Sequence, residues 1–398
     1  MIVAGIMSGT SADGIEVALV RITEPRRPST RGRRQRAKRS PGSTSTRLQL
    51  LAHASYPYPK AVRDDVLSAM NASKASVADL ARLNFLLGEL YADAVLATQH
   101  KFRLRAELVG CHGQTLFHQG DLQPYLGRRV AVTWQTGEGA ILAARVGTPV
   151  ISDFRPADMA AGGKGAPLVP FLDYLLYRDP NIGRIAQNIG GIANLTAIPA
   201  GAPAEKVTAF DTGPGNMVID AVTERLFHKP FDRDGHIAAS GNVHEKLIIR
   251  ILRQAFFRKS PPKTGGREEF GREFVQEFIR LCGRIPKEDV VASATALTAR
   301  SIRAAIAAFV LSRTKSYEEI VVSGGGAKNA TLLAMLANEL KPLGLTLRLS
   351  DEFGLPATAK EAAAFALLAY ETWNHRPSNV PSATGAKRPA ILGKISYA

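Results

Sequence analysis

The chain has 398 residues, 45% of them hydrophobic and 22% charged, a composition typical of a folded protein long enough for two domains with separate cores. Its two cysteines, Cys111 and Cys282, stand far apart, which excludes a disulfide-rich scaffold and a cysteine zinc site. No apolar run approaches the roughly 20 residues of a membrane-spanning helix, and the first residues lead straight into a strand-like pattern, so we expect a cytoplasmic protein without a membrane partner.

The formal net charge of +16 is concentrated in one segment. Nine arginines and lysines, and no acidic residue, fall between positions 25 and 47 among serine, proline and glycine. Such a stretch cannot bury apolar surface, so we expect a disordered basic insertion within residues 23–47. It lacks the aromatic residues of RNA-binding surfaces. A nucleic-acid partner is therefore not expected, although an anion-binding or nuclear-import role stays open.

The first third of the chain alternates strand-like and helical patterns. The expected elements are a strand at 2–6, a glycine-bearing turn from Ser8 to Gly14, strands at 15–22 and 48–55, an amphipathic helix at 77–100 and a strand at 108–111. The first two strands predict a β-hairpin. The motif CHGQT comes next, at the carboxyl end of a strand, where α/β proteins hold ligands.

A second cycle begins near Arg184 and repeats this plan. The segments RIAQNI, ANLTAI and KVTAF predict three more strands, separated by a glycine turn and a loop. A helix at 292–311, a strand at 319–323, a helix ending near Leu340 and a final helix at 358–371 are expected after them. The chain therefore has two related halves. We expect one lobe of residues 1–155 plus 356–398 and a second lobe of residues 156–355.

Three glycine-bearing loops each follow a predicted strand: SGTSADG at 8–14, DTGPGN at 211–216 and SGGGAKN at 323–329. Glycine lets the backbone approach a phosphate group and direct its N–H groups toward it, and a helix that starts directly afterwards adds a favourable dipole. Tight turns also need glycine, so one such loop alone would be weak evidence. No GxxxxGK[ST] or protein-kinase motif is present, and three loops together favour a phosphate site of the actin and sugar-kinase type.

Longer motifs make the likeness specific. SGTSADGIE, CHGQT, GKGAPLVP, QNIGGIANLT, FDTGPGNMVIDA, PPKTGGREEF and SGGGAKN stand in an order that resembles the anhydro-N-acetylmuramic acid kinase family and its relative levoglucosan kinase. The resemblance covers nearly the whole chain apart from residues 23–47. It implies an α/β, two-lobed actin-like ATPase and sugar-kinase fold of the RNase H-like class, with ATP and sugar in the cleft. It also implies a kinase that phosphorylates O6 of a 1,6-anhydro sugar while water opens the anhydro bridge.

The resemblance and the local chemistry suggest roles for individual residues. Asp211 is the expected catalytic base, because its carboxylate could take a proton from the attacking water; an Asp that only caps the following turn is the alternative. Mg²⁺ is expected with ATP, held by Glu361 and Asp211 through few direct bonds. The expected ATP-binding residues are Ser8, Gly9, Thr10, Ser11, Asp13, Gly14, Gly213, Gly215, Asn216, Gly324, Gly325, Gly326 and Asn329. The expected sugar-binding residues are Gln114, Thr115, Asp153, Arg155 and Asn188.

Several alternatives remain open at this level. The favoured reaction converts 1,6-anhydro-N-acetylmuramic acid to N-acetylmuramic acid 6-phosphate, and levoglucosan kinase, which gives glucose 6-phosphate, is the nearest alternative. An ordinary hexose kinase, or a non-catalytic protein that binds nucleotide, sugar or nucleic acid, would also use such loops. His112 stays open between a structural and a functional role. The expected partner is a small anhydro sugar, and assembly as a homodimer is left open.

Overall fold

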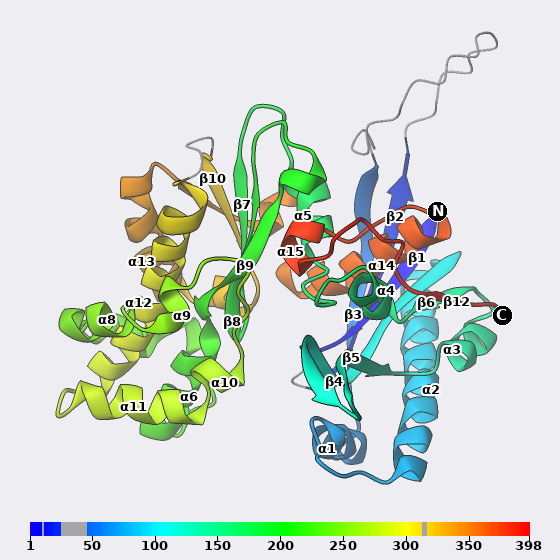
Figure 1. Ribbon diagram of the computed structural model, residues 1–398, viewed down its shortest axis with the longest axis horizontal. Coiled ribbons are helices and arrows are strands. Elements are labelled where there is room, and N and C mark those ends of the chain that lie inside the picture. Colours follow the sequence, from blue (N-terminus) through cyan, green and yellow to red (C-terminus); the bar gives the residue numbers. More distant parts are fainter. Residues whose placement is uncertain (10–11, 25–45, 313–316) are drawn as a thin grey trace. The chain divides into compact units, whose positions relative to one another are not determined.

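The structure, a computed structural model, describes residues 1–9, 12–24, 46–312 and 317–398. The basic insertion expected within residues 23–47 lies almost wholly outside the described residues, as do Thr10 and Ser11. The chain forms two compact units (Figure 1). Unit 1 comprises residues 1–176, 203–205 and 359–398, and unit 2 comprises residues 177–202 and 206–358.

Unit 1 is built on a seven-stranded sheet with the order β12-β6-β4-β1-β2-β3, with β5 paired to β4. Its strands are β1 (Ile2–Ser8), β2 (Gly14–Thr23), β3 (Arg47–Pro57), β4 (Leu108–Tyr125), β5 (Arg128–Thr136), β6 (Val150–Ser152) and β12 (Lys394–Ser396). Its helices are α1 (Lys60–Ala69), α2 (Val77–Phe102), α3 (Gly139–Val146), α4 (Phe154–Ala160), α14 (Lys360–Trp373) and α15 (Pro381–Thr384), and α5 (Pro170–Tyr177) ends at the boundary with unit 2.

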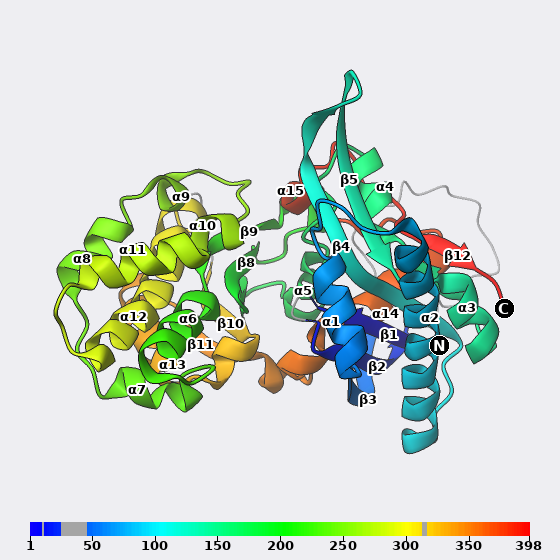
Figure 2. The same cartoon turned by 90° about the horizontal axis from the view of Figure 1, so that it is seen from below.

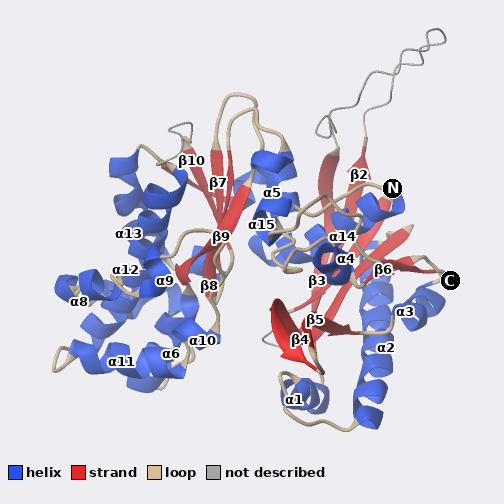
Figure 3. Cartoon of the chain, in the orientation of Figure 1, coloured by secondary structure: helices blue, strands red, loops and turns tan. Residues whose placement is uncertain are grey.

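Unit 2 is built on a five-stranded sheet with the order β11-β10-β7-β8-β9. Its strands are β7 (Arg184–Ile189), β8 (Ile192–Ile198), β9 (Thr208–Pro214), β10 (Glu319–Ser323) and β11 (Thr346–Leu349). Its helices are α6 (Asn216–Phe227), α7 (His236–Ala239), α8 (Glu245–Ile251), α9 (Ala255–Arg258), α10 (Arg267–Phe270), α11 (Arg272–Cys282), α12 (Lys287–Ala305) and α13 (Ala330–Leu340). Helices flank the sheet in each unit (Figure 3).

Both sheets share one five-strand topology. In each unit the first three strands form an antiparallel meander, and the fourth strand pairs parallel to the first: β1 with β4 in unit 1, and β7 with β10 in unit 2. A fifth strand, β6 or β11, then pairs parallel to the fourth. Short turns suffice for the antiparallel strands, whereas the parallel ones need crossover connections. This duplicated order is the RNase H-like plan, and it confirms the expected actin-like α/β class.

Helix α14 lies unusually close to the sheet of unit 1. A Cβ atom added to Gly5 on β1 would lie 1.8 Å from the carbonyl oxygen of Ala362, and one on Gly110 would lie 2.1 Å from that of Phe365. Only glycine at these two positions lets the helix backbone rest on β1 and β4. The contact fixes the start of α14, and therefore Glu361, relative to the sheet.

Helix α12 forms the centre of the unit 2 core and packs against α6, α13 and β9. Continued by a π-helical turn at Ile306–Val310, it is the one helix in the described part of the chain that is long and apolar enough to cross a membrane. However, 78% of its most apolar window is buried inside the unit. That burial is the pattern of a core helix.

Three local expectations differ from the structure. CHGQT does not follow a strand: it lies inside β4, which runs past the end of β1 and continues with β5 as a long two-stranded ribbon (Figure 2). Likewise β9 extends to Pro214, because residues up to that position pair with β8, so Asp211 lies within the strand. Finally, α14 is followed by α15 and β12, and is not the last element.

The unit boundary also falls later than residue 155. Asp158 on α4 accepts hydrogen bonds from Asn379 Nδ2 (2.7 Å) and Thr384 Oγ1 (2.8 Å), and Asp153 accepts one from Lys394 Nζ (3.0 Å). These bonds tie the segment after residue 152 to the C-terminal part of the chain. Helix α4 and most of α5 therefore belong to unit 1.

Candidate functional site

The turn between β1 and β2 is held by a buried network of side chains. The Ser8 hydroxyl donates to Gln114 Oε1 at 2.6 Å and lies 2.9 Å from the hydroxyl of Tyr58, which donates to Tyr91 at 3.2 Å. Gln114 Nε2 donates to the carbonyl oxygen of Gly9 at 3.2 Å. Ser8 and Gln114 are both buried, so their side chains hold the two ends of the glycine turn from the interior of the unit.

The other described residues of this turn are more open. Asp13 is exposed and pairs with Arg63 at 3.2 Å, a surface contact that contributes little to stability. A Cβ on Gly14 would lie 2.3 Å from the carbonyl oxygen of Tyr56 on β3, so the close approach of the third strand requires glycine there. Residues Gly9, Asp13 and Gly14 thus frame the turn, while Thr10 and Ser11 lie outside the described residues.

Arg155, at the start of α4, is held by two acceptors. Its Nη1 donates to the Gly165 carbonyl at 2.8 Å, and its Nε and Nη2 lie 3.2 and 2.8 Å from His112 Nε2. His112 Nδ1 lies 2.7 Å from the carbonyl oxygen of Gly113, so Nδ1 carries the proton and Nε2 can accept. His112 is therefore neutral. Burial and the adjacent guanidinium hold the pKa of His112 well below its usual value.

Glu361, on the first turn of α14, lies in the electrostatic field of Arg155. Its side chain reaches solvent, yet the protein around it removes part of its hydration, which raises its pKa; Lys360 and Arg155 act in the opposite direction. Burial also lowers the pKa of Arg155 to about 10, against the effect of Glu361 and Asp158. Unit 1 thus brings Arg155, His112 and Glu361 into one charged cluster.

Two other candidates for sugar binding in unit 1, Thr115 and Asp153, contact neighbouring side chains. Thr115 accepts a hydrogen bond from Gln135 Nε2 at 3.2 Å on the paired strand β5. Asp153 adopts a left-handed backbone conformation (φ 52°) before α4 and pairs with the exposed Lys394. Both assignments as sugar contacts stay predictions.

In unit 2 the second glycine loop folds against the predicted glycine turn between β7 and β8, which sequence analysis did not assign to ligand binding. The carbonyl oxygens of Gly190 and Gly191, between β7 and β8, accept the backbone N–H groups of Asn216 (2.7 Å), Gly215 (2.9 Å) and Met217 (3.1 Å). The amides at the start of α6 are thus already engaged. A Cβ on Gly215 would lie 2.2 Å from the carbonyl oxygen of Gly190, so only glycine allows this contact.

The Gly190–Gly191 turn of unit 2 occupies the position that the Ser8–Gly14 turn has in unit 1. It joins the first two strands of unit 2, as the Ser8–Gly14 turn joins the first two of unit 1. The signal was present in the sequence as the repeat of strand, glycine turn and strand. Its glycines were left out of the candidate residues because QNIGG was considered only for Asn188, which lies one residue before the end of β7 and pairs with Asn194.

The third glycine loop lies beside the same turn. A Cβ on Gly324 would lie 2.6 Å from Asn188 Oδ1, and one on Gly326 would lie 2.4 Å from a side-chain methyl of Ile189. Gly325 lies closest to Asn216 Nδ2, at 3.3 Å by the same measure. Asn329 caps α13 by accepting the N–H of Leu332 at 2.9 Å. The two predicted ATP loops of unit 2, at 213–216 and 324–329, therefore converge around Gly190.

Asp211 is clamped by the segment between α9 and α10. Its backbone N–H donates to the carbonyl oxygen of Lys263 at 3.1 Å, and its Oδ2 accepts the N–H of Gly265 at 2.8 Å. Burial raises the pKa of Asp211 to about 6, whereas the Gly265 amide and the charge of Lys263 lower it. A carboxylate held at a fixed angle with a pKa near neutrality suits a general base.

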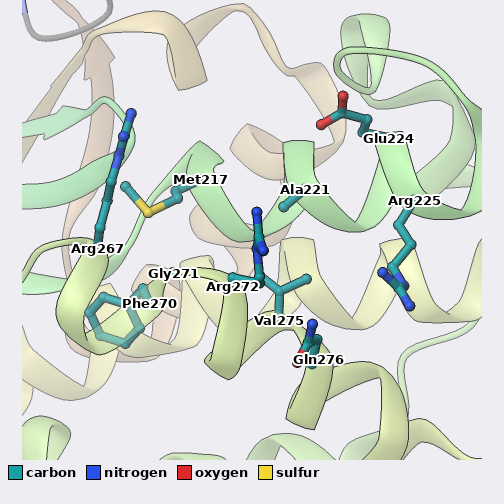
Figure 4. A pocket seen from close by; sticks show the side chains of 10 residues that line it. All are labelled: Met217, Ala221, Glu224, Arg225, Arg267, Phe270, Gly271, Arg272, Val275 and Gln276. Carbon is teal, nitrogen blue, oxygen red and sulfur yellow. The ribbon is translucent and has the colours of Figure 1, made fainter. Parts of the chain in front are cut away.

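A pocket of about 450 Å³ in unit 2 adjoins this segment. Its apolar wall is formed by Met217, Ala221, Phe270 and Val275, and three arginines stand around it, as Figure 4 shows. Arg267 and Arg272 extend in the same direction beside Met217, and Arg225 lies at the opposite end. Within the described residues, none of these three guanidinium groups has an ion pair, and Glu224 is the one acidic residue in the lining. The pocket therefore favours a ligand with negative charge.

The two carboxylates expected to hold magnesium each have cationic neighbours. Lys263 acts on Asp211, and Lys360 and Arg155 act on Glu361. Among the described residues, no group of three or more histidine, cysteine, aspartate or glutamate side chains is placed to hold a metal ion. A dedicated protein cage is not needed for magnesium that arrives with ATP, because such an ion binds one or two carboxylates and takes its other ligands from water and the substrate phosphates.

The chain matches known proteins along its full length. The family model described as anhydro-N-acetylmuramic acid kinase matches residues 1–398. The chain is 41% identical over 400 residues to an anhydro-N-acetylmuramic acid kinase of Bacillus cereus, covering 100% of this chain and 99% of that protein. It is 42% identical over 402 residues to the one of Caldanaerobacter subterraneus subsp. tengcongensis, covering 99% and 96%.

Solved structures give more distant similarities. A ROK hexokinase from Thermus thermophilus aligns with a TM-score of 0.39 and 15% identity over 94% of this chain and all of that one. A ROK family glucokinase from Streptomyces griseus, solved with glucose and AMPPNP, aligns with a TM-score of 0.40 and 10% identity, covering 93% of this chain and all of that one. With the family model and the relatives matched along the full chain, the protein belongs to the anhydro-N-acetylmuramic acid kinase family.

Proposed function

We propose that the protein is an ATP-dependent kinase that opens the 1,6-anhydro bridge of 1,6-anhydro-N-acetylmuramic acid with water and phosphorylates O6. The product is N-acetylmuramic acid 6-phosphate, formed in the cytoplasm. Family membership supports the reaction class. The observation that carries the mechanism is Asp211, a partly buried carboxylate with a pKa of about 6, held by the Gly265 amide.

In this mechanism Asp211 takes one proton from the water that attacks C1 of the sugar. A new bond forms between C1 and the water oxygen while the bond from C1 to O6 breaks. The electron pair left on O6 attacks the γ-phosphorus of ATP, and ADP leaves. The Gly265 amide orients the carboxylate for the first step, because it fixes one of the two carboxylate oxygens.

The glycine turns are the proposed contacts of ATP. The Ser8–Gly14 turn of unit 1 and the two converging loops of unit 2 supply backbone that comes close to neighbouring groups only because glycine lacks a Cβ atom. Magnesium would enter as the MgATP substrate, since Asp211 and Glu361 have cationic neighbours. Arg155, Asn188, Thr115 and Glu361 remain proposed contacts of the substrates.

The arginine-lined pocket supports the acidic sugar over levoglucosan. Muramic acid carries a carboxylate, whereas levoglucosan is neutral, and Arg267 begins α10 two residues after Gly265, whose amide binds Asp211. Charge-assisted hydrogen bonds from unpaired guanidinium groups favour the acid. A non-catalytic binding protein would have no need for a clamped carboxylate with a raised pKa.

The test is ATP consumption by the purified protein with Mg²⁺ and 1,6-anhydro-N-acetylmuramic acid, levoglucosan or glucose. We expect the highest kcat/KM with the first sugar. In ¹⁸O-labelled water the product should carry one label on C1 when its reducing end is analysed promptly, before exchange. Product without label at that time would indicate an ordinary hexose kinase mechanism. No turnover with any sugar would contradict the proposal.

A further inference from the structure

Lys263 is a buried cation that the mechanism above does not use. Its side chain is 2% exposed and lies between α9 and α10 in unit 2. Its Nζ donates to the carbonyl oxygen of Phe256 at 3.3 Å. It also lies 4.9 Å from the ring centroid of Phe256, 5.0 Å from that of Phe309 and 5.9 Å from that of Phe210.

This environment differs from that of Lys360, the other buried lysine of the described chain. Lys360 pairs directly with Asp173 at 2.7 Å. Lys263 has no carboxylate within 4.0 Å among the described residues, and aromatic faces take that place. Burying an ammonium group without a direct counter-charge is costly, and an apolar side chain would fill the space more cheaply. The charge itself therefore needs a reason.

The reason lies in the link between Lys263 and Asp211. The backbone carbonyl of Lys263 accepts the N–H of Asp211, and the amide two residues later, Gly265, binds the carboxylate. Phe210, which precedes Asp211 on β9, is one of the three rings around the ammonium group. The aromatic cage, the clamp and the carboxylate thus form one rigid assembly.

We propose that Lys263 is a positioning residue for Asp211: its buried ammonium group anchors the clamp in the aromatic cage, and the clamp in turn fixes the direction of the carboxylate. The proposal rests on the proposed function only in taking Asp211 as the base. Lys263 itself touches neither the water nor the sugar in this scheme.

The experiment measures kcat and KM for the wild type, Lys263→Met, Lys263→Arg and the exposed control Lys259→Met. In Lys263→Met we expect kcat to fall roughly tenfold while KM for ATP stays the same, because the carboxylate loses its direction and the glycine loops do not change. Lys263→Arg should restore most of the lost kcat, because a guanidinium also stays charged among aromatic rings. Lys259→Met should match the wild type. A wild-type kcat in Lys263→Met, or an equal loss of kcat in Lys263→Met and Lys263→Arg, would overturn the proposal.

A second readout does not depend on the sugar. The amide resonance of Gly265, identified by its response to Asp211→Asn, reports the hydrogen bond between the clamp and the carboxylate directly. We expect this resonance to shift in Lys263→Met and to stay near the wild-type position in Lys263→Arg. If Lys263→Met does not fold, a wild-type kcat and Gly265 resonance in Lys263→Arg support the proposal, and their loss contradicts it. A wild type inactive on every sugar but with a Gly265 resonance that responds to Lys263→Met would reject the proposed function and keep this inference.

Discussion

The two units share one strand topology but stabilise their first turn by different means. In unit 1 the turn rests on side chains, with Ser8, Gln114, Tyr58 and Tyr91 joined in a buried network. In unit 2 the Gly190–Gly191 turn is held by backbone N–H groups at the start of α6. A duplicated fold can therefore keep its geometry while the interactions that maintain it diverge.

The buried charges differ in the same way. Unit 1 pairs the guanidinium of Arg155 with a neutral imidazole, His112, whereas unit 2 places the carboxylate of Asp211 in the field of a caged lysine, Lys263. One arrangement keeps a cation with an uncharged acceptor, and the other keeps an anion near a cation. Substitutions at His112 should therefore affect stability and its pH dependence, and substitutions at Asp211 should affect turnover.

The largest expected effect is on turnover in unit 2. Asp211→Asn preserves shape and can still accept the Gly265 amide, but it cannot take a proton. We expect kcat to fall by about 10²–10⁴-fold with ATP binding kept. Steady-state kinetics and nucleotide binding by calorimetry check this. A kcat within a few-fold of the wild-type value would show that Asp211 is not the base. It would also contradict the expectation that substitutions at Asp211 affect turnover.

The next effect is on stability in unit 1. Gly5→Ala forces a Cβ to within 1.8 Å of the Ala362 carbonyl oxygen, so α14 must move away from β1. We expect a loss of about 3 kcal/mol or more in the free energy of unfolding, measured by urea denaturation. Gly190→Ala is the matched control, since a Cβ there meets nothing closer than 3.6 Å. It should keep stability, and an equal loss in both variants would contradict the packing argument.

A smaller effect separates the hydrogen bond of His112 from its volume. His112→Phe keeps a ring against Phe365 but removes the acceptor for Arg155, and should cost about 1–3 kcal/mol. His112→Gln offers an amide oxygen in place of Nε2 and should restore part of that loss. Equal unfolding free energies for the two variants would show that the acceptor does not matter.

The same residue should give a pH dependence of stability. The folded pKa of His112 lies below its ordinary value of about 6.5, so the unfolded chain takes up the proton first. The stability linked to this group is present above pH 6.5 and is lost as pH falls. His112→Gln should therefore show a smaller loss between pH 7 and 5 than the wild type. His118, whose pKa is lowered to about 4 by burial and Arg155, should leave a residual slope in the same direction.

The smallest expected effect concerns the charged pocket of unit 2. Arg267→Ala and Arg272→Ala should each raise KM for 1,6-anhydro-N-acetylmuramic acid by about 3- to 10-fold, because exposed guanidinium groups contribute modestly to binding an anion. KM for levoglucosan should not change, and Arg253→Ala, outside the pocket, serves as control. Equal changes for both sugars would mean that the pocket does not select the acid.

The family, the fold class and most of the glycine loops follow from the amino-acid sequence. Local patterns sufficed for this, because hairpin strands, glycine turns and the helices after DTGPGN and SGGGAKN depend on residues close together in the chain. Other features of the site depend on how distant segments pack against each other. Gln114 supports a glycine turn because β4 runs parallel to β1, and Gly190 accepts a hydrogen bond from the start of α6 because that helix packs against it.

The sequence PPKTGGRE does not distinguish Lys263 from an exposed lysine. Phe256 stands only seven residues before Lys263, but Phe210 and Phe309 come from distant segments and complete the cage when the chain folds. Burial and long-range contacts are properties of the packed core and not of spacing along the chain.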